Sequence, residues 1–217
     1  MSVIPSPALP ALRQLLRERF PASPHGRTSP LVTGLPAIDE ATGGLPRPAL
    51  TELVCSAPSC GSQLFAGQLL GVTRAAGLRV ALVDAGDAFD PASWPPALLE
   101  HLVWVRAGSA GQAMAATDLL VRDANLALVM LDLRYAPPGE LRRIPASNWY
   151  RLQRALESTV LAALVISPFA MVPSAQLRIE LRSAHSLATQ SAARSVLNLA
   201  LAPVLRRQRN ADLAAAG

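Results

Sequence analysis

The chain has 217 residues and a hydrophobic fraction of 51%, enough for one domain with a buried core and a short extension. No apolar run is long enough to span a bilayer and the first ten residues do not resemble a signal peptide, so we expect a cytoplasmic protein without membrane contact. The net charge of +5 permits contact with nucleic acid, but all 20 basic residues are arginine, which excludes any site that needs a lysine.

The N-terminal segment has an apolar stripe near helical spacing, with arginines on other sides of the turn. The stripe consists of Leu9, Leu12, Leu16 and Phe20. A proline-rich stretch follows it, so we predict an amphipathic helix and linker over residues 1–30. A helix this short is marginal in water, so we expect its stripe to be buried on a partner protein or on the chain's own domain.

Apolar segments with strand character alternate with helical stretches in the middle of the chain. The predicted strands are Leu50–Val54, Val80–Val83, Leu102–Val105, Ala127–Leu131 and Ala162–Ile166. The predicted helices are a short one within residues 31–45 and longer ones over Gly61–Ala76, Gln112–Asp123 and Asn148–Val160. This alternation predicts an α/β fold whose mostly parallel central sheet has helices on both faces.

The last part of the chain changes period. Leu177, Ile179 and Leu181 alternate with charged residues, which predicts a half-exposed, antiparallel edge strand. We expect a second edge strand over Val196–Leu201 to pair with it. The predicted main domain then spans residues 31–203, and residues 204–217 form a basic, flexible tail.

The segment after the first predicted strand has the outline of a phosphate-binding loop, strand–turn–helix. A working loop reads G-x-x-x-x-G-K-[ST], in which the lysine reaches the outer phosphates and the hydroxyl holds magnesium. Here Ser56 takes the place of the first glycine, Ser62 that of the lysine and Gln63 that of the hydroxyl residue, while Gly61 is retained. The loop therefore has the frame of a nucleotide site without its chemistry.

Cys55 and Cys60 flank this loop, and no further cysteine is present to complete a zinc set. We interpret both as small buried residues. The three histidines, His25, His101 and His185, show no ligand spacing, so we expect no metal site and no catalytic constellation.

Several segments together resemble the RecA-like ATPase core over most of Leu31–Leu201: TGLPAIDEATGGLPR, the loop itself, VDAGDAFDP and LALVMLD. Within that superfamily the chain resembles the ImuA family, on the segments LPRPALTEL, VALVDAGDAFDP, HLVWVR and WYRLQRALE. The resemblance implies that Gly86 stands where recombinases have the glutamate that activates water, and that Asp132 matches the carboxylate that holds magnesium. Glycine cannot accept a proton, so we expect a pseudo-ATPase with no cofactor.

The DNA-contacting loops of a recombinase follow the strands that end near Asp132 and Ile166. The resemblance implies a shortened second loop here, SPFAMVPSAQ. The first loop keeps Arg134, Arg142 and Arg143, which are candidates for phosphate contact, and a solvated basic loop is the alternative. Gly61 and Asp132 also have plain structural explanations, as a helix start packed against a strand and as a turn cap.

The ImuA resemblance implies a non-catalytic accessory or scaffold protein of error-prone translesion DNA synthesis in the bacterial SOS response, acting through protein–protein contacts. The implied partners are an ImuB-type Y-family polymerase homologue, an error-prone replicative-type DNA polymerase and RecA, with weak or indirect DNA contact. Two alternatives stay open. One is a SulA-type cell-division inhibitor. The other is a weakly active DNA-dependent ATPase of the recombinase class, which the missing lysine disfavours.

Overall fold

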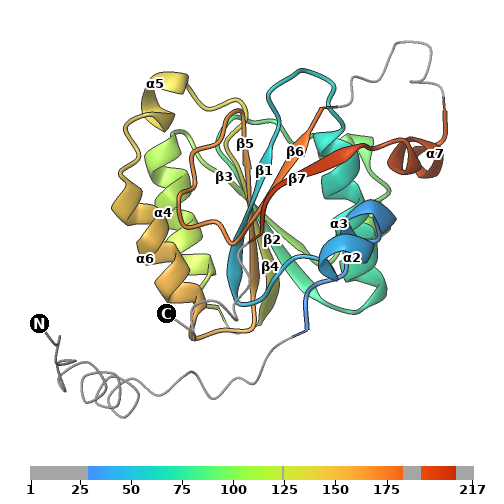
Figure 1. Cartoon of the computed structure of the whole chain (residues 1–217), viewed down its shortest axis with the longest axis horizontal. Helices are drawn as coiled ribbons and strands as arrows, with labels where there is room; N and C mark the ends of the chain where they lie inside the picture. Colours follow the sequence, from blue (N-terminus) through green and yellow to red (C-terminus); the bar gives the residue numbers. More distant parts are fainter. Residues whose placement is uncertain (1–28, 124, 183–191, 209–217) are drawn as a thin grey trace, which may run out of the picture.

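The computed structural model describes residues 29–123, 125–182 and 192–208, which form one seven-stranded sheet between two layers of helices (Figure 1). The strand order is β3-β2-β4-β5-β1-β6-β7. The strands are β1 (Ala49–Val54), β2 (Arg79–Asp84), β3 (Leu102–Arg106), β4 (Leu126–Asp132), β5 (Ala162–Ser167), β6 (Leu177–Leu181) and β7 (Pro203–Gln208). All neighbouring pairs are parallel except β6 with β7. The predicted α/β class is confirmed, and the sheet is consistent with a RecA-like core.

Helices α4 and α6 cover one face of the sheet, and α2 and α3 cover the other (Figure 1). The described helices are α2 (Pro36–Thr42), α3 (Ser62–Ala75), α4 (Ala110–Leu120), α5 (Pro138–Leu141), α6 (Ala146–Leu156) and α7 (Arg194–Leu199), with short 3₁₀ turns η1 (Pro91–Ser93) and η2 (Pro96–Leu98). Within the described residues, no helix has both the length and the apolar character that crossing a bilayer requires.

The two helical layers explain why the central strands are apolar at every position. In β2, Val80 and Leu82 pack into the cluster beneath α3, whereas Ala81 and Val83 pack into the cluster beneath α4 and α6. Successive side chains of a strand point to opposite faces, so a strand covered on both faces is buried throughout. The five strands predicted from apolar segments are all present, and their observed ends differ from the predicted ones by one residue at most.

The C-terminal part of the sheet differs from the prediction. The alternating segment is strand β6, as expected, but it pairs in parallel with β1 and is antiparallel only to β7. The strand predicted over Val196–Leu201 is wrong, because these residues mostly form α7. Asn198 donates from Nδ2 to Oε1 of Gln68 on α3 at 2.8 Å. The segment is too short for its sequence pattern to distinguish a helix from a strand, and this contact with α3 favours the helix.

The outer strand of the sheet is instead β7, which begins at Pro203. Proline is tolerated at the first residue of an edge strand, where its missing N–H breaks no ladder bond. The tail predicted to start at residue 204 therefore starts too early, since residues 204–208 belong to β7. Residues 1–28 and 209–217 lie outside the described part of the chain, as does the predicted N-terminal helix.

Candidate functional site

The loop between β1 and α3 lies where the carboxyl ends of the parallel strands meet. The amide of Cys55 donates to the carbonyl of Ser167 on β5 at 2.8 Å, which fixes the start of the loop. The loop then turns sharply through Ser59, with φ of 55°, and Gly61, with φ of 91°. Left-handed φ is costly for most residues but not for glycine, which explains why Gly61 is retained at the start of α3.

Arg134 closes this loop from the opposite side. Its Nε lies 2.9 Å from Oδ1 of Asp132 at the end of β4, and its Nη2 lies 2.5 Å from Oδ2. Its Nη1 donates to Oγ of Ser62, the residue in the lysine position of the loop. The carboxylate that was expected to match a magnesium ligand therefore binds an arginine of the same chain.

The Asp132–Arg134 pair is buried, with side-chain exposures of 5% and 10%. Burial by itself lowers the pKa of Arg134, but the hydrogen bonds and the charge of Asp132 outweigh it and leave the pKa raised. The guanidinium thus stays charged beside the loop. Asp132 also accepts the amide of Arg134 at 3.1 Å, so it caps the turn as well, which was the structural alternative.

Gly86 lies against the segment that carries Arg134. A Cβ atom on Gly86 would be 2.6 Å from Cβ of Tyr135 and 2.9 Å from its carbonyl carbon. The loop around Gly86 is itself fixed, because the buried carboxylate of Asp84 accepts the amides of Gly86, Ala88 and Phe89 at 2.9–3.2 Å. There is no space for a glutamate in the position where the resemblance places the water-activating residue.

Gln63, in the position of the magnesium-binding hydroxyl, points away from the loop towards the segment after β2. Its Nε2 donates to the carbonyl of Ala88 at 3.1 Å. Ser56, in the position of the first glycine, lies in the exposed stretch of the loop. These contacts bring Gly61, Ser62, Asp132 and Arg134 into one cluster, and they leave Ser56 and Gln63 outside it.

The arrangement does not fit a magnesium–nucleotide complex. A pocket of about 310 Å³ adjoins the loop, but its lining includes Arg134 and Leu197 of α7, and no lysine. The nearby carboxylate of Asp132 does not line the pocket and is already paired with Arg134. Among the described residues, no group of three or more His, Cys, Asp or Glu side chains has the geometry to hold a metal ion.

Cys55 and Cys60 are both buried, with exposures of 7% and 2%, and both are free thiols. Their hydrogen bond, together with burial, raises the pKa of Cys55. The same hydrogen bond, with help from the amide and hydroxyl of Ser62 and the charge of Arg134, lowers the pKa of Cys60 to about 6, although burial opposes it. The prediction that both are buried is confirmed, and the pKa values of the two thiols are shifted in opposite directions.

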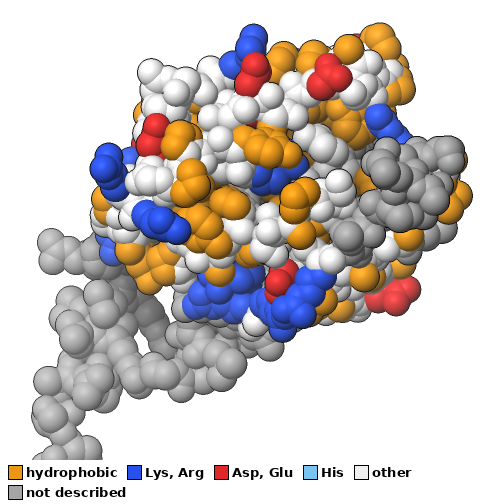
Figure 2. Space-filling view, turned by 90° about the horizontal axis from the view of Figure 1, so that it is seen from above, with side chains coloured by type: hydrophobic (Ala, Val, Ile, Leu, Met, Phe, Trp, Pro, Cys, Tyr) orange, Lys and Arg blue, Asp and Glu red, His pale blue; other side chains and the backbone are white. Residues whose placement is uncertain are grey.

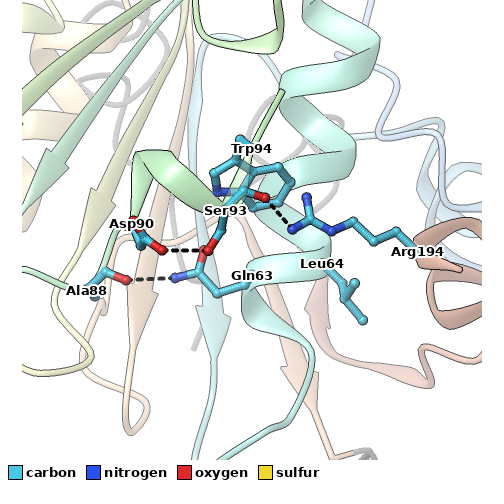
Figure 3. Close-up of a pocket in the computed structure, with 7 residues that line it drawn as sticks. All are labelled: Gln63, Leu64, Ala88, Asp90, Ser93, Trp94 and Arg194. Atoms are coloured by element: carbon cyan, nitrogen blue, oxygen red, sulfur yellow. Dashed lines mark hydrogen bonds between the residues drawn. The ribbon is translucent and has the colours of Figure 1, made fainter. Parts of the chain in front are cut away.

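A second pocket, of about 230 Å³, lies beside α3 and was not expected from the sequence (Figure 3). Arg194 at the start of α7 stacks on the Trp94 ring, with Cζ 4.1 Å from the ring centroid, and donates to the carbonyl of Ser93 at 2.6 Å. Trp94 in turn packs against Gly67, where a Cβ would lie 2.1 Å from the indole. These contacts hold α7 against the domain.

The loop after β5, which would be the second DNA-contacting loop, is tied to the sheet. The buried carboxylate of Glu52 on β1 accepts the amides of Met171 and Val172 at 2.6 and 3.0 Å and the hydroxyl of Ser167 at 3.2 Å. These hydrogen bonds fix the backbone of the loop after β5. That this loop is shortened relative to the second DNA-contacting loop of a recombinase stays a prediction.

The structure separates the three arginines that were predicted to contact DNA. Arg142 and Arg143 are exposed after α5, so phosphate contact by these two stays a prediction. The alternative of a solvated basic loop does not hold for Arg134, because its side chain is buried against Asp132 and Ser62; phosphate contact by Arg134 also stays a prediction. Arginines are scattered over the face seen in Figure 2, with a larger group only at its lower margin, so this face offers no continuous basic track.

The docking residues Leu9, Leu12, Leu16 and Phe20 lie outside the described residues. Fold and site together define an α/β domain, consistent with a RecA-like core, in which an arginine of the same chain binds the loop between β1 and α3. No protein-family model matches the chain, and no curated protein matches it in sequence.

Proposed function

We propose that this protein is a non-catalytic accessory or scaffold protein that works through protein–protein contacts. One observation carries the proposal: the guanidinium of Arg134 bridges Asp132 and Ser62, so a cation of the chain takes the place of nucleotide-bound magnesium and the loop lysine. Gly86 supports it, because its backbone contact with Tyr135 excludes a catalytic side chain. A scaffold needs a folded domain that its partners can bind, and it does not need to hydrolyse ATP.

The ImuA resemblance supplies the proposed setting, which is error-prone translesion DNA synthesis during the bacterial SOS response. The proposed partners are an ImuB-type Y-family polymerase homologue, an error-prone replicative-type DNA polymerase and RecA. A RecA-like fold hosts many activities, so the setting rests on the resemblance and not on the fold.

Calorimetry tests the non-catalytic part of the proposal. Titration of magnesium–ATP into the full chain is expected to give no binding heat at physiological nucleotide concentration. Removing a single charge-assisted hydrogen bond to phosphate costs about 1.5–3 kcal/mol, so a loop without its lysine and hydroxyl binds nucleotide orders of magnitude more weakly. Micromolar affinity, or phosphate release stimulated by single-stranded DNA, would instead support the recombinase-class ATPase.

Genetics tests the setting. Deletion of the gene in its host is expected to lower the frequency of damage-induced mutation, and plasmid-borne wild type and Ser62→Ala are expected to restore it equally. Filamentous growth after overproduction, with unchanged mutation frequency in the deletion strain, would support the SulA-type division inhibitor and overturn the translesion proposal.

The N-terminal stripe is the proposed docking element, through Leu9, Leu12, Leu16 and Phe20. Burial of such side chains contributes about 1.5–3 kcal/mol each before ordering costs, enough for a specific transient contact. Removal of residues 1–22 is expected to abolish capture of the polymerase partner without changing the melting temperature. A large fall in melting temperature with capture intact would mean that the helix belongs to the domain.

A further inference from the structure

The two cysteines of the chain bracket the closed loop, Cys55 directly after β1 and Cys60 directly before Gly61. Both side chains belong to the same buried cluster on the α3 side of the sheet, and each thiol shifts the pKa of the other. The four residues between them, 56–59, are exposed. Two buried thiols thus lie at the two ends of an exposed four-residue segment.

Both ends of the loop are anchored, so the pair does not depend on a free segment. The amide of Cys55 is bonded to Ser167 on β5, and the carbonyl of Gly61 accepts the amide of Phe65 inside α3 at 2.9 Å. The left-handed turns at Ser59 and Gly61 bring the chain back towards its start. The backbone positions of the two cysteines are therefore fixed by the loop.

We propose that Cys55 and Cys60 form an oxidation site that reacts with hydrogen peroxide or another small hydroperoxide and closes to an intramolecular disulfide. The proposal does not depend on the translesion setting. It assigns chemistry to a loop whose nucleotide chemistry is missing.

The reaction balances in two steps. The Cys60 thiolate attacks one peroxide oxygen, the O–O bond breaks, and a sulfenic acid forms while hydroxide leaves and is protonated to water. The Cys55 sulfur then attacks the sulfenic sulfur, the S–O bond breaks, and a second water leaves with the Cys55 proton. Two thiols lose two hydrogens and two electrons, and one peroxide becomes two waters.

The surroundings assign the attacking sulfur. The hydroxyl and amide of Ser62 favour the thiolate of Cys60 and do not act on Cys55, whereas the charge of Arg134 acts on both thiols. Cys55, whose pKa is raised, is then the resolving thiol. Burial excludes bulky reagents, so the site should prefer an oxidant close to water in size.

Intact-mass spectrometry of the native full chain tests the proposal, with hydrogen peroxide as the probe. A loss of about 2 Da that a reductant reverses is expected, since disulfide formation removes two hydrogens. Both cysteines lie in one tryptic peptide, because no arginine separates them, so the same loss is expected in that unreduced peptide. Oxygen addition at Cys60 without closure, or no change while the half-buried Met171 is already oxidised, would overturn the proposal.

Two matched variants identify the order of attack. Cys60→Ser is expected to be inert to peroxide at its remaining thiol, whereas Cys55→Ser is expected to gain about 16 Da, the mass of one oxygen, as a sulfenic acid that a reductant removes. Equal oxygen addition in both variants would refute the assignment of Cys60 as the attacking thiol. Melting curves check that each variant folds, and the wild-type mass shift stands without them.

Discussion

Arg178 on β6 and Glu52 on β1 form an ion pair between neighbouring strands, with Nε of Arg178 2.5 Å from Oε2 of Glu52. The carboxylate is fully buried, whereas the arginine side chain is 21% exposed. Arg178 also donates to the carbonyl of Val172 at 3.0 Å, so this pair joins the centre of the sheet to the loop after β5.

Arg178→Met is expected to destabilise the domain by about 3 kcal/mol, because removal of one partner leaves an uncompensated buried charge. Arg206→Met is the matched control. Its partner Glu180 lies nearer the surface and Arg206 is 41% exposed, so a change of about 0–1 kcal/mol is expected. Urea unfolding of both variants provides the measurement, and equal losses would contradict the burial argument.

Gly86→Ala is expected to destabilise the domain by about 1–3 kcal/mol, since the added methyl group would collide with the Tyr135 backbone. Gly139→Ala is the control. No atom lies within 4 Å of a Cβ added there, so its free energy of unfolding should change by no more than about 0.5 kcal/mol. If thermal unfolding shows Gly86→Ala to be neutral, the segment carrying Arg134 is not held against the loop after β2.

The Cys60 thiol is expected to titrate with a pKa of about 6 in the folded protein, as followed by thiolate absorbance in the ultraviolet. The charged and titratable groups that act on it are Cys55 and Arg134. Arg134→Met removes a positive charge that favours the thiolate, so the midpoint should move to higher pH. A midpoint that stays in place would mean that Arg134 does not act on Cys60.

The lowered pKa of Cys60 also determines whether the free energy of unfolding rises or falls with pH. Between the folded value near 6 and the unfolded value near 9, the unfolded chain binds more protons, so this thiol stabilises the fold increasingly as pH rises. Its contribution is lost as pH falls through about 6. The difference in unfolding free energy between wild type and Cys60→Ser should therefore grow with pH across this window.

Single-stranded DNA binding is expected to be weak and dominated by salt-sensitive contacts of Arg142 and Arg143. Two phosphate contacts predict an affinity loss of about sevenfold between 50 and 200 mM salt. Fluorescence anisotropy with Arg142→Glu/Arg143→Glu should show no binding, with Arg206→Glu as the control on β7. Tight binding that persists at the higher salt would contradict the expected weak contact.

The sequence was sufficient for the parallel sheet because strands buried on both faces leave continuous apolar runs, as in Val80–Val83. The sequence did not predict helix α7, because the contact of Asn198 with Gln68 on α3, which favours the helix, cannot be read from the local pattern. The loop was recognised from Gly61 and its neighbours. The closure by Arg134 was missed, since Ser62 lies 72 positions away, although an arginine two residues after Asp132 in a chain without lysine was a usable signal. The contact of Arg194 with Trp94 left no pattern in the sequence.

The position of β1 in the sheet has a consequence for synthesis on the ribosome. This strand is made early and is fully buried, but its neighbours are β5, reached at Ala162, and β6, reached at Leu177. The strands β2, β3 and β4 can pair with one another while β1 still has two open edges. Until most of the chain has left the exit tunnel, the segment 49–54 is therefore a natural site for a nascent-chain chaperone, and chains that terminate before residue 177 should aggregate through it.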